Sequence, residues 1–300
     1  MNRRDFVSAG FSAAGMLALG GCAGVFGGVR ERAPYGELVG DRLWMWGHHR
    51  ESFKSLKNKR EGYNLPYETR IDMADACRQM DIPGCFVVRW RNLPTAAEMP
   101  VYMKQFSDMR RIGFSITDSA VESFDEKVRL GLEYAEKFPN LSHFVMDDFW
   151  SGAAKGVTLD KIRPVKDELA VRGMKLCVVL YSDQNGIKPE QKAVLDLCDE
   201  VTLWFWHGKN TSDMESRVAK LRELIGNEKP VLLGQYMWDF GGRKPMPGAV
   251  MEKQLEQTSR LLADRAVSGV IFHCTPLVDM GLDAVKVSRS WIAANKSLRF

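Results

Sequence analysis

Eight short apolar runs that alternate with stretches of helical period are the feature of this chain that most limits how it can fold. The runs start at Arg42 and recur as far as Cys274, at residues 42–49, 84–90, 113–118, 142–148, 175–183, 200–207, 230–239 and 269–274. Such alternation is typical of β/α units around a parallel sheet. Eight units in roughly 255 residues match the size of a (β/α)8 barrel.

The stretches between the runs include clear helical candidates at 68–80, 125–138, 159–173 and 251–266. An open doubly wound sheet usually carries a GxGxxG turn after its first strand, and this sequence has none. We therefore predict a single TIM-barrel domain over residues 41–300.

Polar residues gather where the apolar runs end, which is where the active site of such a barrel lies. They are His48, His49, Arg89, Arg91, Asp118, Asp147, Asp148, Tyr181, Asp183, His207, Lys209, Gln235, Asp239 and His273. Because four of the five histidines fall at these ends, chance placement is a poor explanation. We predict that these residues line an active-site mouth, together with Trp150 and Trp238.

The pleat of a strand predicts which of these side chains face inward, since alternate residues point to opposite sides. In the run 142–148, the bulky Phe144 and Met146 are expected to face the helices. Asp147 then points into the barrel, and Asp148 begins the following loop.

The same reasoning applied to the run 84–90 places Phe86, Val88 and Trp90 on the outer face. Arg89 and Arg91 are then expected to point inward or over the mouth. On the other strands, Gln235 is expected to share a face with Asp239, and Tyr181 with Asp183.

Aromatic residues crowd the same ends of the runs and indicate a carbohydrate-like lining, because a flat ring buries the apolar face of a sugar. We expect some of them to be ordinary core, above all Trp44, Trp204 and Tyr236. The full set is Trp44, Trp46, Trp90, Trp150, Tyr181, Trp204, Trp206, Tyr236 and Trp238.

Paired carboxyl groups from the fourth and seventh runs suit glycosidic bond cleavage. Asp147 or Asp148 would act with Asp239, and in outline this resembles the TIM-barrel glycoside hydrolases. Arg89 is expected to keep Asp147 ionised as nucleophile or base, while Trp238 and Phe240 would desolvate Asp239 and suit it as the acid. This reading needs no metal and no cofactor, and its partner is a carbohydrate substrate.

Two alternatives stay open. His48, His49, His207, His273 and the Asp pair could hold a divalent ion, in a metal-dependent hydrolase that resembles the amidohydrolase barrels loosely. The chain could also be a glycan-binding lipoprotein that has kept the barrel without the chemistry.

The N-terminal residues predict export. Arg3-Arg4 resembles a twin-arginine signal, and Leu19-Gly20-Gly21-Cys22 resembles the lipobox of bacterial lipoproteins, in which the cysteine is acylated. We expect residues 1–21 to be a signal peptide, Cys22 to be the lipidation site, and the Gly-rich residues 22–40 to be a tether. The protein would then lie on the periplasmic side of the envelope, anchored to a membrane by lipid.

Charge and cysteine content exclude other classes. The formal net charge is +4 without a basic stripe, which argues against nucleic-acid binding. After Cys22 the cysteines are Cys77, Cys85, Cys177, Cys198 and Cys274, an odd number without CxxC spacing. Buried free thiols are therefore expected.

Overall fold

The computed structural model describes residues 31–54, 63–66, 68–151, 154–182 and 186–300. The predicted signal peptide and Cys22 lie outside these ranges. Of the helices in these ranges, none combines the length and the apolar character needed to cross a membrane.

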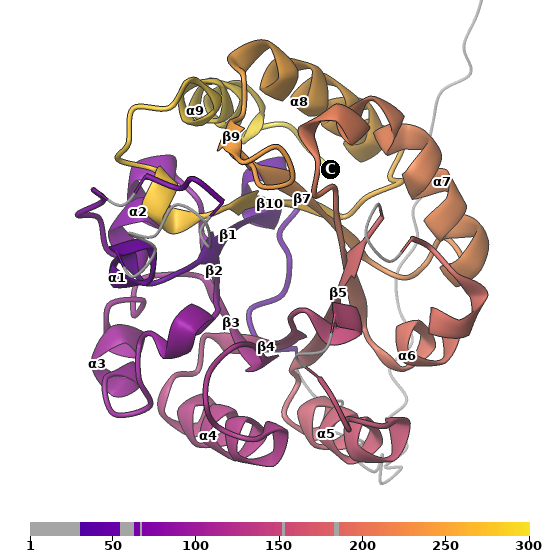
Figure 1. Cartoon of the computed structure of the whole chain (residues 1–300). Helices are drawn as coiled ribbons and strands as arrows, with labels where there is room; N and C mark the ends of the chain where they lie inside the picture. Colours follow the sequence, from indigo (N-terminus) through magenta and orange to yellow (C-terminus); the bar gives the residue numbers. More distant parts are fainter. Residues whose placement is uncertain (1–30, 55–62, 67, 152–153, 183–185) are drawn as a thin grey trace, which may run out of the picture.

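Eight parallel strands close into a barrel surrounded by helices (Figure 1), so the predicted (β/α)8 fold is confirmed. The strands follow one another around the ring in chain order, and the last one, β10, pairs with both β7 and β1 to close it. Each overlaps one predicted run: β1 Leu43–Gly47, β2 Gly84–Val87, β3 Arg111–Thr117, β4 Leu141–Met146, β5 Lys175–Tyr181, β6 Glu200–Trp204, β7 Val231–Tyr236 and β10 Gly269–His273.

The helices cover the outside of the barrel, and four of them overlap the four predicted stretches. They are α1 Arg50–Lys54, α2 Met73–Met80, α3 Met99–Lys104, α4 Phe124–Lys137, α5 Leu159–Val171, α6 Lys192–Leu197, α7 Met214–Ile225, α8 Gly248–Ala263 and α9 Asp283–Asn295. Their amphipathic spacing explains the packing, as in α8, which buries Met251, Leu255 and Leu262.

Shorter elements fill the connections. A two-stranded antiparallel pair, β8 Trp238–Asp239 and β9 Lys244–Pro245, follows β7. The 3-10 helices are η1 Val39–Arg42, η2 Trp90–Asn92, η3 Phe149–Ser151, η4 Pro189–Gln191, η5 Gly208–Asp213 and η6 Thr275–Leu277.

Large aromatic rings fill the barrel interior because neighbouring strands carry glycine. A Cβ at Gly113 would lie 2.1 Å from the ring of Phe86, and one at Gly234 would lie 2.1 Å from the ring of Trp204. Phe86 stacks on Trp44 with ring centroids 4.3 Å apart. Phe86 therefore points inward, and the prediction that it faces the helices is wrong.

The pleat of β4 is confirmed. Phe144 packs against α4, where a Cβ at Gly131 would lie 2.5 Å from its ring. His143, on the opposite face, lies in the interior with its ring 4.8 Å from that of Trp44. Asp147, four residues after His143, continues this inward face.

The N-terminal end of the barrel is closed by residues that the sequence suggested were a tether. The Tyr35 hydroxyl donates to the buried Glu200 carboxylate at 3.0 Å, and the Arg32 guanidinium donates to the Ala135 carbonyl at 2.8 Å. The indigo segment in Figure 1 crosses the barrel here. Residues 31–40 therefore belong to the folded domain.

The five cysteines after Cys22 are buried free thiols, as predicted: Cys77, Cys85, Cys177, Cys198 and Cys274.

The contact between Gly234 and Trp204 is expected to limit stability. Gly234→Ala should lower the free energy of unfolding by about 1–3 kcal/mol, because the ring of Trp204 has to move away from the new methyl group. Denaturant unfolding measures this loss.

Gly248→Ala is the matched control, since its Cβ meets nothing closer than 3.4 Å at the start of α8. Its effect should stay within about 0.5 kcal/mol. Equal effects of the two substitutions would contradict the packing account.

Candidate active site

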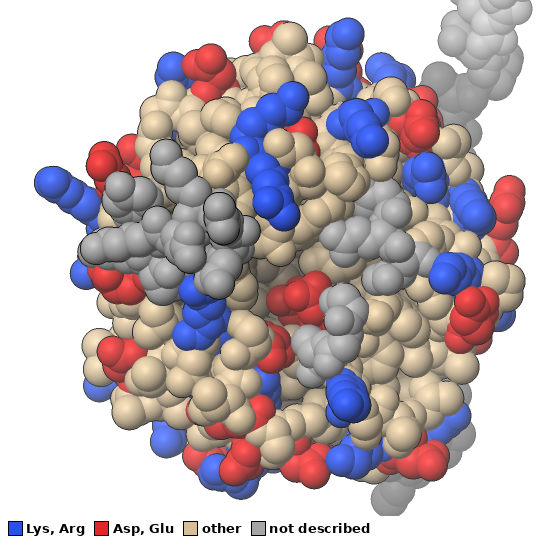
Figure 2. All heavy atoms as spheres, viewed as in Figure 1, with Lys and Arg blue, Asp and Glu red and all other residues tan. Residues whose placement is uncertain are grey.

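A pocket opens at the C-terminal end of the barrel, and Figure 2 shows a hollow near the centre of this face with acidic side chains in it. The cavity has a volume of about 80 Å³. One water molecule needs roughly 10–15 Å³, so the pocket has room for a small polar group. Its lining comprises Trp46, His48, Phe53, Tyr63, Trp90, Asp147, Asp148, Tyr181, Trp204, Trp206, Tyr236, Phe240 and His273.

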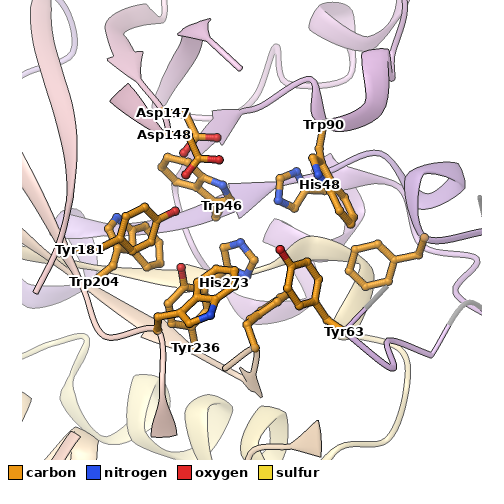
Figure 3. A pocket seen from close by; sticks show the side chains of 13 residues that line it. Trp46, His48, Tyr63, Trp90, Asp147, Asp148, Tyr181, Trp204, Tyr236 and His273 are labelled. Carbon is orange, nitrogen blue, oxygen red and sulfur yellow. The ribbon is translucent and has the colours of Figure 1, made fainter. Parts of the chain in front are cut away.

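Two adjacent carboxyl groups form one wall of the pocket (Figure 3). Asp147 continues the inward face of β4 beyond Met146. Asp148 has a φ of +49°, a left-handed conformation that Asp adopts more readily than most residues. This turn breaks the strand alternation, which explains how consecutive side chains both reach the pocket.

The environment of Asp147 favours its protonated form. Burial raises the pKa of Asp147 well above its usual range, and the neighbouring carboxylates of Asp148 and Asp118 raise it further. Asp147 is thus better suited than an ordinary aspartate to hold and donate a proton.

Tyr181, at the end of β5, positions the second carboxylate. Its hydroxyl donates a hydrogen bond to Asp148. Burial, followed by the effects of Tyr236 and Asp148, raises the pKa of Tyr181 well above its usual value, so the phenol keeps its proton. The two groups form a donor–acceptor pair at the pocket wall.

Two histidines lie at the pocket floor. His48 follows β1 and His273 ends β10, with ring centroids 5.3 Å apart. Burial lowers the pKa of His48 to about 4, and burial together with His48 lowers that of His273 well below its usual value. Both rings are therefore neutral at neutral pH.

Aromatic rings make up the rest of the wall. They include Trp204 and Tyr236, which the sequence suggested were ordinary core, and whose rings lie 5.1 Å apart. Only Trp44 of that group lies away from the pocket, at the N-terminal end. Phe53, Tyr63 and Phe240 were not predicted as lining residues, since Phe53 and Tyr63 come from the connection after β1, where no periodic signal marks them.

Arg89 and Asp118 lie outside the pocket, contrary to prediction. Because Phe86 points inward, the alternation of side chains along the same run turns Arg89 outward. The Arg89 guanidinium pairs with Glu122 at 2.8 Å, and Asp118 pairs with Lys127 at 2.7 Å, with all but Glu122 almost fully buried. Arg89 thus does not keep Asp147 ionised, and the expected role of Asp147 as nucleophile or base is not supported.

Gln235 and Asp239 also serve the scaffold. Gln235 donates to Thr258 of α8 at 3.0 Å, so it faces the helices. The Asp239 carboxylate accepts from the backbone N–H groups of Gly208 at 3.0 Å and Gly242 at 2.8 Å. The predicted pair of Asp147 and Asp239 across the mouth is therefore not formed.

The remaining predicted residues lie beside the pocket or away from it. His49 contacts the Tyr102 hydroxyl, and the Trp238 indole donates to the Tyr63 carbonyl at 3.1 Å. Arg91 is exposed and stacks over Trp90 at 5.5 Å. The others outside the pocket lining are Trp150, His207 and Lys209, and Asp183 lies outside the described residues.

No protein-family model and no curated protein matches this chain. Solved structures match its fold. They include a glycoside hydrolase family 5 mannosidase from Rhizomucor miehei (9% identity, 87% of this chain and 95% of that one, TM-score 0.52). They also include a GH18 chitinase from Pseudoalteromonas aurantia (12%, 83% and 99%, 0.51) and the spore cortex-lytic enzyme SleL from Bacillus cereus (12%, 85% and 74%, 0.50).

At these identities the likeness establishes the fold alone. The chain is a TIM barrel that resembles glycoside hydrolases in structure, and its pocket combines aromatic rings, two carboxyl groups and two neutral imidazoles.

The raised pKa of Asp147 predicts a pH-dependent stability. The folded state binds this proton more tightly than the unfolded chain, whose Asp pKa is roughly 3.9. Wild-type stability should therefore fall as the pH rises from that value towards the raised pKa. Asp147→Asn cannot ionise, so its melting temperature relative to wild type should increase over the same window.

Asp167→Asn, at an exposed position on α5, is the control and should show no such trend. A difference between Asp147→Asn and wild type that stays constant from pH 4 to pH 8 would contradict the raised pKa.

Proposed function

We propose that this protein hydrolyses a glycosidic bond, with Asp147 as general acid. The observation that carries the proposal is a pair of adjacent carboxyl groups, Asp147 and Asp148, in a pocket walled by aromatic rings. Burial and the neighbouring carboxylates raise the pKa of Asp147, which suits it to hold a proton. Two of the structurally similar proteins are a mannosidase and a chitinase, which supports a carbohydrate substrate for this barrel.

Each group has a chemical role in the proposal. Asp147 donates its proton to the glycosidic oxygen as the bond to the leaving sugar breaks. Asp148, positioned by Tyr181, stabilises the positive charge that develops on the sugar ring. The aromatic faces of Trp204 and Trp206 pack against the sugar. A water molecule then adds to the sugar carbon at which the bond broke, and its proton returns to Asp147, which the first step left ionised.

The histidine pair has a different role. His48 and His273 line the pocket, and a neutral imidazole can accept a hydrogen bond from a sugar hydroxyl group. Such hydrogen bonds would orient the sugar next to the carboxyl groups of Asp147 and Asp148.

Single substitutions test the proposal on a panel of oligosaccharides. Asp147→Asn and Asp148→Asn should each lower kcat by about 10²–10⁴-fold while leaving the fold intact, because both groups act in the transition state. Asp239→Asn is the control and should keep most of the activity, since Asp239 supports a loop outside the pocket.

The same panel separates the alternatives. Hydrolysis lost on chelation but retained by Asp147→Asn would favour a metal-dependent hydrolase. Sugar binding by wild type without hydrolysis of any panel member would favour a glycan-binding protein and contradict the proposal.

We also propose that the chain is exported and anchored by lipid at Cys22, as its N-terminal motifs indicate. Residues 31–40 lie against the N-terminal end of the barrel, opposite the pocket. The nine residue steps from Cys22 to Glu31 span at most about 30 Å. An anchor at Cys22 would then hold the barrel close to the membrane with the pocket facing away from it.

Cys22→Ser should abolish this anchoring. The variant is expected to be absent from the detergent-soluble membrane fraction, because an acyl chain can no longer be attached. Cys77→Ser, which changes a buried thiol, is the control and should stay with the membrane. Unchanged partitioning of Cys22→Ser would contradict lipidation there.

A further inference from the structure

His48 and His273, which line the pocket, form a cluster with the buried Cys274, and one potential ligand atom from each of the three lies within 4.8 Å of the others. The Nδ1 atoms of both histidines are buried and have no hydrogen-bond partner among the described residues. Buried polar atoms without partners are uncommon in folded proteins and call for an explanation, such as a bound water or ion.

We propose that these three residues bind a divalent metal ion of the zinc class. The proposal goes beyond the glycosidic activity and does not depend on it, because proton donation by Asp147 needs no metal.

The backbone around the cluster is held rigidly. In the barrel register Trp46 pairs with His273, and His48 and Cys274 come directly after the ends of the neighbouring strands β1 and β10. The Thr275 hydroxyl accepts from the His48 N–H at 3.0 Å and donates to the His48 carbonyl at 2.8 Å. This clamp joins the two ligand-bearing segments.

The Nδ1 atom of His48 is buried and has no hydrogen-bond partner among the described residues, so its lone pair is available to a ligand. The Val88 backbone lies close enough to the ring to raise its pKa against the larger effect of burial.

The donor set selects the kind of ion. Two imidazole nitrogens and one sulfur suit Zn²⁺ or Co²⁺ and do not suit Mg²⁺ or Ca²⁺, which prefer oxygen. Binding would convert the Cys274 thiol to a metal-bound thiolate and release one proton to solvent. A water molecule could complete the coordination of the ion.

A second cluster serves as an internal comparison. His143, Cys177 and Glu200 lie at the N-terminal end of the barrel, equally buried. There the histidine Nδ1 already bonds to Ser142 at 2.7 Å, and the Glu200 carboxylate accepts from Tyr35 at 3.0 Å. Inside the cluster, His143 Nε2 lies 3.6 Å from the Glu200 carboxylate and the Cys177 thiol lies 3.7 Å from it. The Glu200 carboxylate thus faces donors on three sides, and we do not propose a metal in this cluster.

Cobalt binding tests the site on the full chain, in a Cys22→Ser background that removes the N-terminal thiol. Metal-stripped protein titrated with Co²⁺ should develop the visible bands of tetrahedral cobalt and a near-ultraviolet thiolate-to-cobalt band, saturating at one equivalent. Addition of Zn²⁺ should bleach these bands and raise the melting temperature.

Cys274→Ser should remove the thiolate band, and His273→Ala should weaken Co²⁺ binding by roughly 100-fold or more, since even partners of ligands change affinity 10–100-fold. Cys177→Ser should leave the spectrum unchanged, and circular dichroism checks that each variant is folded. Absence of a thiolate band in the Cys274-containing protein would overturn the proposal whatever the variants do. A band that survives Cys274→Ser, or is lost in Cys177→Ser, would also overturn it.

Discussion

The packing of large aromatic rings against glycine residues determines where the barrel interior has space for a ligand. Phe86 lies over Gly113 and Trp204 over Gly234, at distances that leave no room for a Cβ. Trp44 stacks on Phe86, so aromatic rings pack the interior towards the N-terminal end of the barrel. The interior therefore offers space at the C-terminal mouth, where Trp204 forms part of the pocket.

The two ends of the barrel differ in electrostatics. At the N-terminal end the buried Glu200 is satisfied by Tyr35 and lies 3.6 Å from His143, and these contacts lower its pKa against the opposing effect of burial. At the mouth, burial and neighbouring negative charge raise the pKa of Asp147 instead. A satisfied charge supports the fold at one end, and a perturbed carboxyl group is available for chemistry at the other.

Strand positions could be predicted from sequence because buried parallel strands appear as apolar runs, and their ends identified Asp147, Asp148, His48 and His273. The phase of each strand was harder to predict. Side-chain bulk placed Phe86 outside, whereas the space beside Gly113 on the next strand holds it inside.

That one reversal accounts for the error on Arg89, which follows the pleat of the same strand. Asp239 was misplaced for a different reason. It lies beyond the end of β7, in the β8–β9 pair, where strand alternation no longer applies and its carboxylate supports the backbone. Such errors arise from contacts between distant segments, which a single strand pattern does not contain.

The central claim is that the pKa of the Asp147 carboxyl group lies well above that of a free aspartate. Carbon-13 NMR of aspartate-labelled protein measures this directly, with Asp147→Asn identifying the signal. The account predicts that the Asp147 carboxyl carbon remains in its protonated position well above pH 3.9, the approximate pKa of a free aspartate. Ionisation of Asp147 at or below that pH would contradict it.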